Sequence, residues 1–278
     1  MLRVLTILFY SSIVLFAKDS IVVSIAPQKF FVQKIAGDLV DITILVPSGS
    51  NPATYAPKPK QLSTLKNSKL YFTIGVSFEK HWLKRFQSIN SNLKIIDTTD
   101  GIKKIKMVHK DHKNHHNEGL DPHVWLSPKL VKVQIKNITK GLISIDPKNR
   151  IRYISNRDKF LDEIDELNIK IAKKLSTLKN RKFIVFHPSF GYFAKDYNLT
   201  QIAIEREGKE PSLKHIKKVI DYASEHNIKT IFVAPQFSQK SASYIASQID
   251  ATIKIINPLA ENWSKNILEI TKSFKSAN

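Results

Sequence analysis

The sequence predicts an α/β protein of two lobes, each a parallel sheet flanked by helices, bridged by one long rigid helix. Three observations support this prediction. Strand-like runs alternate with helical stretches in the first half of the chain, the same plan recurs in the second half, and a long amphipathic segment separates the halves. The length of 278 residues fits about two domains.

The first half contains four short runs rich in β-branched residues, which predict strands at 20–27, 40–47, 70–76 and 93–99. The stretches between them have helical spacing of apolar residues, as in QKFFVQKIAG, where Gly37 is a stop signal. The second half repeats this plan, with strands predicted at 182–188, 200–205, 229–235 and 252–258 and helices at 212–227 and 238–249. Strands that alternate with helices favour a parallel sheet covered by helices.

The segment 146–181 joins the two halves and predicts a single long helix. It has no glycine, and no proline after Pro147. Its apolar residues recur at helical spacing, namely Tyr153, Phe160, Ile164, Leu167, Ile171, Leu175 and Leu178. The domain boundaries that follow are an N-terminal lobe at 18–145, the linking helix at 146–181 and a C-terminal lobe at 182–278.

Residues 1–17 are typical of a signal peptide, because Arg3 precedes an apolar run from Val4 to Phe16 and small Ala17 follows it. The chain has no cysteine, so no lipid can be attached near this segment. We therefore expect an exported, cleaved protein without a lipid anchor, free in a periplasm. The formal net charge of +20 is spread along the chain without a nucleic-acid motif. This pattern indicates a solvated basic surface rather than a nucleic-acid partner.

Ligands of open α/β sheets bind beyond the carboxyl ends of the strands, which directs attention to the segments after each predicted strand. His187 ends the strand KFIVFHP and Asn257 ends TIKIINP, while the loop 47–59 follows the second strand. His123 lies in LDPHVWLSP between two prolines. Two histidines placed at a cleft suggest zinc. The isolated histidines His81, His215 and His226 are given no role.

Catalytic sites find little support in the sequence. The motifs G-x-S-x-G and H-E-x-x-H are absent, and no glycine-rich phosphate loop occurs. Glu205 and Glu207 stand beside Arg206 and Lys209, and we interpret them as surface ion pairs. An exported metallo-hydrolase therefore ranks last, and we expect no enzyme.

Taken in order, several motifs resemble the metal-binding proteins of bacterial zinc and manganese ABC importers, the cluster A-I (TroA-like) solute-binding proteins. The motifs include SIAPQKFFVQKIAGD, VPSGSNPATYAPKPKQL, DPHVWLSP, FHPSFGYF and INPL, and they cover nearly all of the chain after residue 17. The resemblance implies a metal ion held between the lobes and delivered to a membrane permease. We expect the protein to be a monomer. It places metal ligands at His123 and His187, and the histidine at the second of these is a zinc-type trait, so Zn²⁺ is expected before Mn²⁺.

Two positions depart from that family. Its usual first ligand is a histidine after proline, but here the pair is Pro52-Ala53, and the fourth position, often aspartate, is Asn257. Asn257 and the phenol of Tyr55 are weak candidates to fill the gaps. A Lys-rich loop at 109–118 carries His109, His112, His115 and His116, which we interpret as an accessory metal-collecting loop. The alternative is a metal-poor paralogue that acts as an adhesin or partner-binding module on the same scaffold.

Overall fold

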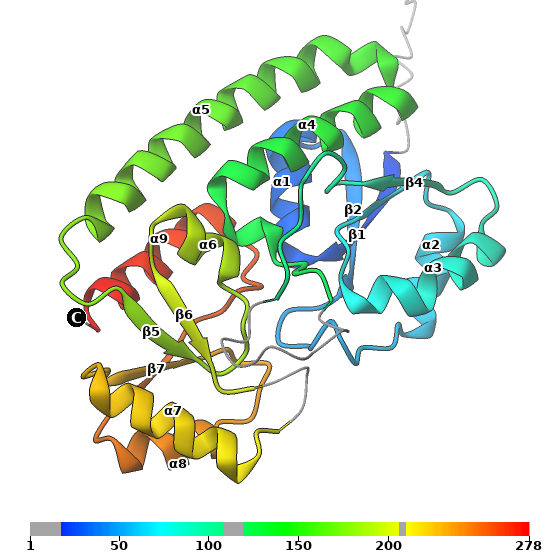
Figure 1. Ribbon diagram of the computed structural model, residues 1–278. Helices are drawn as coiled ribbons and strands as arrows, with labels where there is room; N and C mark the ends of the chain where they lie inside the picture. Colours follow the sequence, from blue (N-terminus) through cyan, green and yellow to red (C-terminus); the bar gives the residue numbers. More distant parts are fainter. Residues whose placement is uncertain (1–17, 108–118, 206–209, 278) are drawn as a thin grey trace, which may run out of the picture.

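The computed structural model describes residues 18–107, 119–205 and 210–277, and it contains two four-stranded parallel sheets (Figure 1). The first sheet has the order β2-β1-β3-β4. Its strands are β1 (Asp19–Ile25), β2 (Val40–Val46), β3 (Leu70–Thr73) and β4 (Lys94–Asp97). The second sheet has the order β6-β5-β7-β8 and consists of β5 (Lys182–Val185), β6 (Thr200–Ala203), β7 (Thr230–Val233) and β8 (Thr252–Ile255). The predicted fold class is confirmed, and the two lobes share one strand order.

Helices cover both sheets. In the first lobe these are α1 (Ala26–Ala36), α2 (Pro59–Lys66) and α3 (Ser77–Ile89), and in the second α6 (Gly191–Asp196), α7 (Leu213–Glu225) and α8 (Lys240–Gln248). The central strands are buried because helices pack on both faces, which is why β3 is buried at all four positions and reads as a continuous apolar run.

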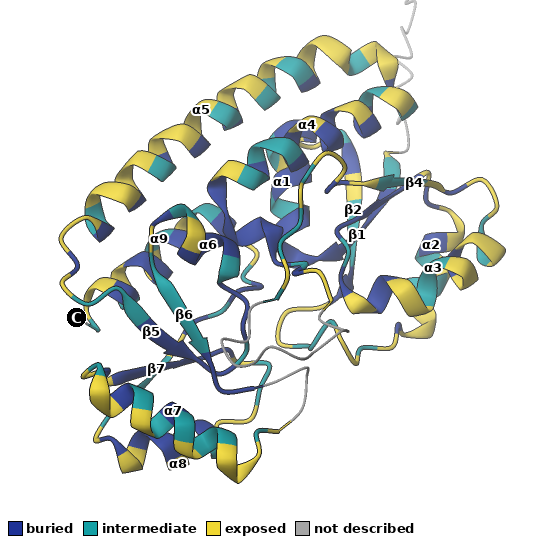
Figure 2. Ribbon diagram, in the orientation of Figure 1, coloured by how far each residue is buried: buried dark blue, intermediate teal, exposed yellow. Residues whose placement is uncertain are grey.

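The long linking helix is α5, which spans 26 residues, Arg150–Leu175, and runs along both lobes (Figure 1). It begins after a 3-10 turn, η2 (Pro147–Asn149). Its apolar stripe faces the protein and its polar face is exposed (Figure 2). Six of the seven predicted stripe residues lie in α5 and are buried. The helix is shorter than the predicted segment 146–181, so the seventh, Leu178, is buried beyond its end.

Two helices that the sequence reading did not identify pack beside α5. These are α4 (Pro128–Ile145), which begins at the N-cap Ser127, and α9 (Trp263–Lys275), which begins at Asn262. Both have apolar residues at helical spacing, for example Val131, Ile135, Ile138 and Leu142 in α4, all fully buried. The periodicity was therefore present in the sequence. No helix in the described ranges is long and apolar enough to span a membrane.

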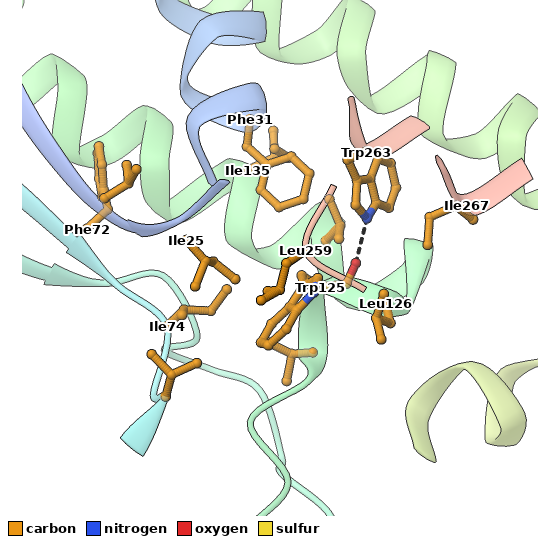
Figure 3. Close-up of a cluster of buried hydrophobic side chains, with 14 of the residues drawn as sticks. Ile25, Phe31, Phe72, Ile74, Trp125, Leu126, Ile135, Leu259, Trp263 and Ile267 are labelled. Carbon is orange, nitrogen blue, oxygen red and sulfur yellow. Dashed lines mark hydrogen bonds between the residues drawn. The ribbon is translucent and has the colours of Figure 1, made fainter. Parts of the chain in front are cut away.

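Two tryptophans join the lobes in a shared core. Trp263 of α9 donates its Nε1–H to the carbonyl of Trp125 at 2.6 Å (Figure 3). Trp125 donates its own Nε1–H to the carbonyl of Pro258 at 2.8 Å. Both indoles are only 1% exposed. Trp125 belongs to the 3-10 turn η1 (Val124–Leu126), so this pair of hydrogen bonds fixes the turn that follows His123 against the second lobe.

The strands end earlier than predicted, which changes the local setting of two candidates. His187 lies two residues beyond the end of β5, and Asn257 lies two residues beyond the end of β8. Both residues therefore sit in loops at the carboxyl edge of the second sheet, where ligands of such sheets bind.

Candidate metal centre

A cavity of about 300 Å³ lies between the two lobes. The first lobe contributes His123 and the loop residues Asn51, Pro52, Ala53 and Thr54, while the second contributes His187, Glu205, Gln236 and Phe237. This volume accommodates a metal ion together with bound water, since one water molecule fills roughly 30 Å³. The predicted meeting of His123, His187 and the loop 47–59 in one cleft agrees with this cavity.

His123 is buried and held by an aspartate two residues before it. The Asp121 carboxylate oxygen Oδ1 accepts the backbone N–H of His123 at 2.9 Å and lies 2.7 Å from its Nδ1. Asp121 is 1% exposed, and the hydroxyl of Tyr192 donates to its carbonyl oxygen at 2.8 Å. The short sequence Asp-Pro-His thus folds back so that the aspartate fixes both the backbone and the ring of the histidine.

His187 has a matching carboxylate from a neighbouring strand. The Nδ1 atom lies 2.8 Å from Oε2 of Glu205, which follows β6, and Glu205 is 3% exposed. Phe237 stacks on the imidazole with ring centroids 4.6 Å apart and an interplanar angle of 20°. The interpretation of Glu205 as a surface ion pair is therefore wrong, because the parallel pairing of β5 with β6 brings it beneath His187. Glu207 lies outside the described residues.

The carboxylates determine which ring nitrogens are available. A carboxylate only accepts hydrogen bonds, so the imidazole proton of each histidine resides on Nδ1 and leaves a lone pair on Nε2. A carboxylate behind the distal nitrogen is the usual support of a metal-ligating histidine. Burial, opposed by the hydrogen bond to Glu205, lowers the pKa of His187 below its ordinary value of 6.5. The neutral form that a metal requires is thereby favoured at neutral pH.

The separation of the two rings fits a shared metal ion. Their centroids are 5.2 Å apart, with an interplanar angle of 72°. A zinc–nitrogen bond of about 2.05 Å puts the ion about 3.2 Å from each ring centroid, and a tetrahedral angle then separates the centroids by about 5.2 Å. The distance between the two ring centroids is therefore the one expected for two imidazoles that share one tetrahedral ion.

The weak candidates have other partners. The hydroxyl of Tyr55 donates to Gln61 at 2.8 Å, and Tyr55 is not among the residues that line the cavity. Oδ1 of Asn257 accepts from the backbone N–H of Leu259 at 2.9 Å and from Gln236 at 3.1 Å, and Asn257 does not line the cavity either. Ala53 does line it, at the position where the resembling family carries its first histidine.

The other histidines fall into two groups. His81, His215 and His226 are not among the residues that line the cavity, and His81 and His215 contact backbone carbonyl oxygens. The four histidines of the predicted accessory loop, His109, His112, His115 and His116, lie outside the described residues, as does the predicted signal peptide at 1–17. Within the described ranges, no group of three or more His, Asp or Glu side chains is arranged to hold a metal ion.

Sequence reasoning missed four residues of this site. Asp121 has a signal in the sequence, because a carboxylate two residues before a histidine can bond to its backbone and ring. Glu205 and Gln236 have no such signal, since the pairing of β5 with β6 and β7 brings them to His187. A fourth, Gly191, leaves room for Asp121, because a Cβ at Gly191 would lie 2.7 Å from the Asp121 oxygen Oδ2.

Comparisons with known proteins agree with this architecture. A solved structure titled "Crystal structure of ZnuA" is 44% identical, with a TM-score of 0.87 over 94% of this chain and 99% of that one. A ZnuA deletion mutant with zinc bound is also 44% identical, with a TM-score of 0.88 over 94% of this chain and 98% of that one. A manganese-bound periplasmic protein from Candidatus Liberibacter asiaticus has a TM-score of 0.82 over 93% and 99% of the two chains, but at 22% identity it supports the fold alone.

Sequence comparisons point the same way. The high-affinity zinc uptake system protein ZnuA of Bacillus subtilis is 31% identical over 89% of this chain and 80% of its own length. A putative metal-binding protein of Chlamydia muridarum is 30% identical over 98% of this chain and 99% of its own. The family model described as "Zinc-uptake complex component A periplasmic" matches residues 21–277. The chain therefore belongs to the ZnuA family and is the solute-binding component of a zinc-uptake ABC transporter, not an enzyme.

Proposed function

We propose that this protein captures Zn²⁺ between Nε2 of His123 and Nε2 of His187 and delivers it to a membrane permease. The observation that carries the proposal is the pair of carboxylate-supported imidazoles, whose ring centroids are 5.2 Å apart across one cavity. Zinc takes imidazole nitrogen readily, and the deleted ZnuA variant of similar fold is described with zinc bound. We place Mn²⁺ second, because that ion prefers oxygen donors.

The buried carboxylates supply the negative charge that the ligands lack. Two neutral imidazoles leave the ion with its full charge of +2, whereas Asp121 and Glu205 carry one negative charge each directly behind the rings. Because both carboxylates are at most 3% exposed, water screens them little. We propose that they hold the rings in position and stabilise the bound cation, while Tyr55 and Asn257 are excluded from direct contact with it.

We further propose how the rest of the chain serves transport. Residues 1–17 act as a cleaved export signal without a lipid anchor, and the protein works in the periplasm as a monomer. The lobes are residues 18–145 and 182–278, with 146–181 as the rigid link that fixes their spacing. The histidines of the segment 109–118 serve as an accessory group that collects zinc.

Calorimetric titration of metal-free protein with Zn²⁺ tests the capture site. We expect one high-affinity site in the wild type and its loss in the His123→Ala/His187→Ala variant, with the zinc-dependent rise in melting temperature lost as well. His81→Ala/His226→Ala is the matched control and retains binding. If the double variant at the cavity binds zinc like the wild type, or the wild type binds none, the proposal is wrong, and the second result favours the metal-poor paralogue.

A further inference from the structure

The carboxyl edge of the second sheet presents four polar residues in the order of its strands. Glu205 follows β6, His187 follows β5, Gln236 follows β7 and Asn257 follows β8, and the strands lie in the order β6-β5-β7-β8. The hydrogen bonds obey this order, because Glu205 contacts His187 and Gln236 contacts Asn257. Gln236 therefore follows the strand that neighbours β5 on the side away from β6, the strand that Glu205 follows.

The orientation of the Gln236 amide is determined by its surroundings. Oδ1 of Asn257 accepts the backbone N–H of Leu259 at 2.9 Å, and a backbone N–H only donates, so this Asn257 atom must be the oxygen. The Gln236 atom 3.1 Å from the same oxygen must then be the donor Nε2. The carbonyl oxygen Oε1 of Gln236 therefore occupies the other branch of the amide.

That oxygen is buried, and among the residues that the structure describes it has no hydrogen-bond partner. An unsatisfied buried acceptor costs roughly 1–3 kcal/mol, and in native proteins it commonly marks the place of a water molecule or an ion. Gln236 lines the cavity together with His123 and His187, and the next residue, Phe237, stacks on the His187 ring. The residue that carries this unpaired oxygen thus lines the same cavity as the two imidazoles.

We propose that Oε1 of Gln236 is a third ligand of the captured metal ion. Asn257 orients the Gln236 amide by accepting a hydrogen bond from its Nε2. This inference rests on the proposed function. It assigns to Gln236 the oxygen donor that Asn257 cannot provide, because the side-chain oxygen of Asn257 already accepts two hydrogen bonds. Two imidazoles, one neutral oxygen and one water complete a four-coordinate site, with Asp121 and Glu205 balancing the charge.

The variants Gln236→Leu and Gln236→Glu separate a ligand from a merely structural residue. Leucine removes both functions of the amide, whereas glutamate retains an oxygen donor but loses the N–H that bonds to Asn257. If Gln236 is a ligand, leucine weakens zinc binding about 10–100-fold, and glutamate binds at least as tightly as the wild type. If Gln236 only braces Asn257, both variants weaken binding and lower the melting temperature together. Gln248→Leu, at an exposed position of α8, is the control.

The readouts are zinc affinity by competition with a chelator, melting temperature without metal, and the visible spectrum of the Co²⁺-loaded protein. We expect the Co²⁺ bands to change in Gln236→Leu and to stay unchanged in Gln248→Leu, because the bands report the atoms bound to the ion. Wild-type affinity in Gln236→Leu, or glutamate as weak as leucine, overturns the ligand role while zinc capture stands. A wild type that binds no zinc overturns both proposals.

Discussion

Replacing Gly191 by alanine puts a methyl group against the carboxylate that orients His123. The new Cβ would lie 2.7 Å from Oδ2 of Asp121, whereas ordinary contacts begin at 3.4 Å, so the carboxylate must retreat by about 0.7 Å. Asp121 is 1% exposed and bonds to the backbone and ring of His123, so the displacement passes directly to the ring. Loss of such a support typically costs 10–100-fold in metal affinity, and we expect that loss here.

Two further glycine variants make this experiment specific. In Gly119→Ala the new Cβ meets no atom of the described residues within 4 Å, so we expect zinc affinity and stability to stay unchanged. In Gly141→Ala the Cβ would lie 2.6 Å from the Phe72 ring, which lowers stability but leaves the metal site intact. Zinc affinity by calorimetry and thermal unfolding without metal are measured for all three. If Gly191→Ala binds zinc like the wild type, or if Gly141→Ala weakens binding equally, the support of His123 by Asp121 is not what determines affinity.

Three other substitutions follow from the structure. Glu205→Gln removes the charge behind His187, and we expect zinc affinity to fall about 10-fold in calorimetry, whereas Glu225→Gln, at the exposed pair with His226, changes nothing. Burial raises the pKa of Glu79 from 4.5 to about 7, so this group's contribution to stability, about 3 kcal/mol, is present below pH 4.5 and lost as the pH rises through 7. In urea unfolding at a series of pH values, the wild type should lose stability as the pH rises from 4.5 to 7, and Glu79→Gln should not. Parallel pH profiles of the variant and the wild type would contradict this expectation. Trp263→Phe leaves the carbonyl of Trp125 unpaired, and we expect the free energy of unfolding to fall by about 2–3 kcal/mol. Tyr244→Phe, at an exposed aromatic residue, is the control and should leave it unchanged.

The fold was predictable because its signals are local and repeated. Eight apolar runs marked the strands, and the stripe from Tyr153 to Leu175 marked α5, which is buried along that face. The helices α4 and α9 were missed although their apolar spacing is visible in the sequence. The predicted strands extend beyond the observed ones because the apolar run continues into the loop. Phe186, for example, is buried beyond the last residue of β5.

The site was predictable only in part, for a physical reason. His123 and His187 stand in recognisable local motifs, but their supports come from elsewhere in the fold. Glu205 is 18 residues from His187 in sequence and meets it because β5 pairs with β6. Gln236 reaches the same edge through β7, and nothing in the tripeptide Pro-Gln-Phe indicates that its oxygen is buried without a partner.

Anomalous diffraction at the zinc absorption edge, from crystals of protein loaded with one equivalent of Zn²⁺, tests the central claim most directly. The account predicts a single strong peak between the lobes, about 2.0–2.1 Å from Nε2 of both His123 and His187. A peak bound by neither histidine, or no peak in the cavity of a fully loaded crystal, would contradict it.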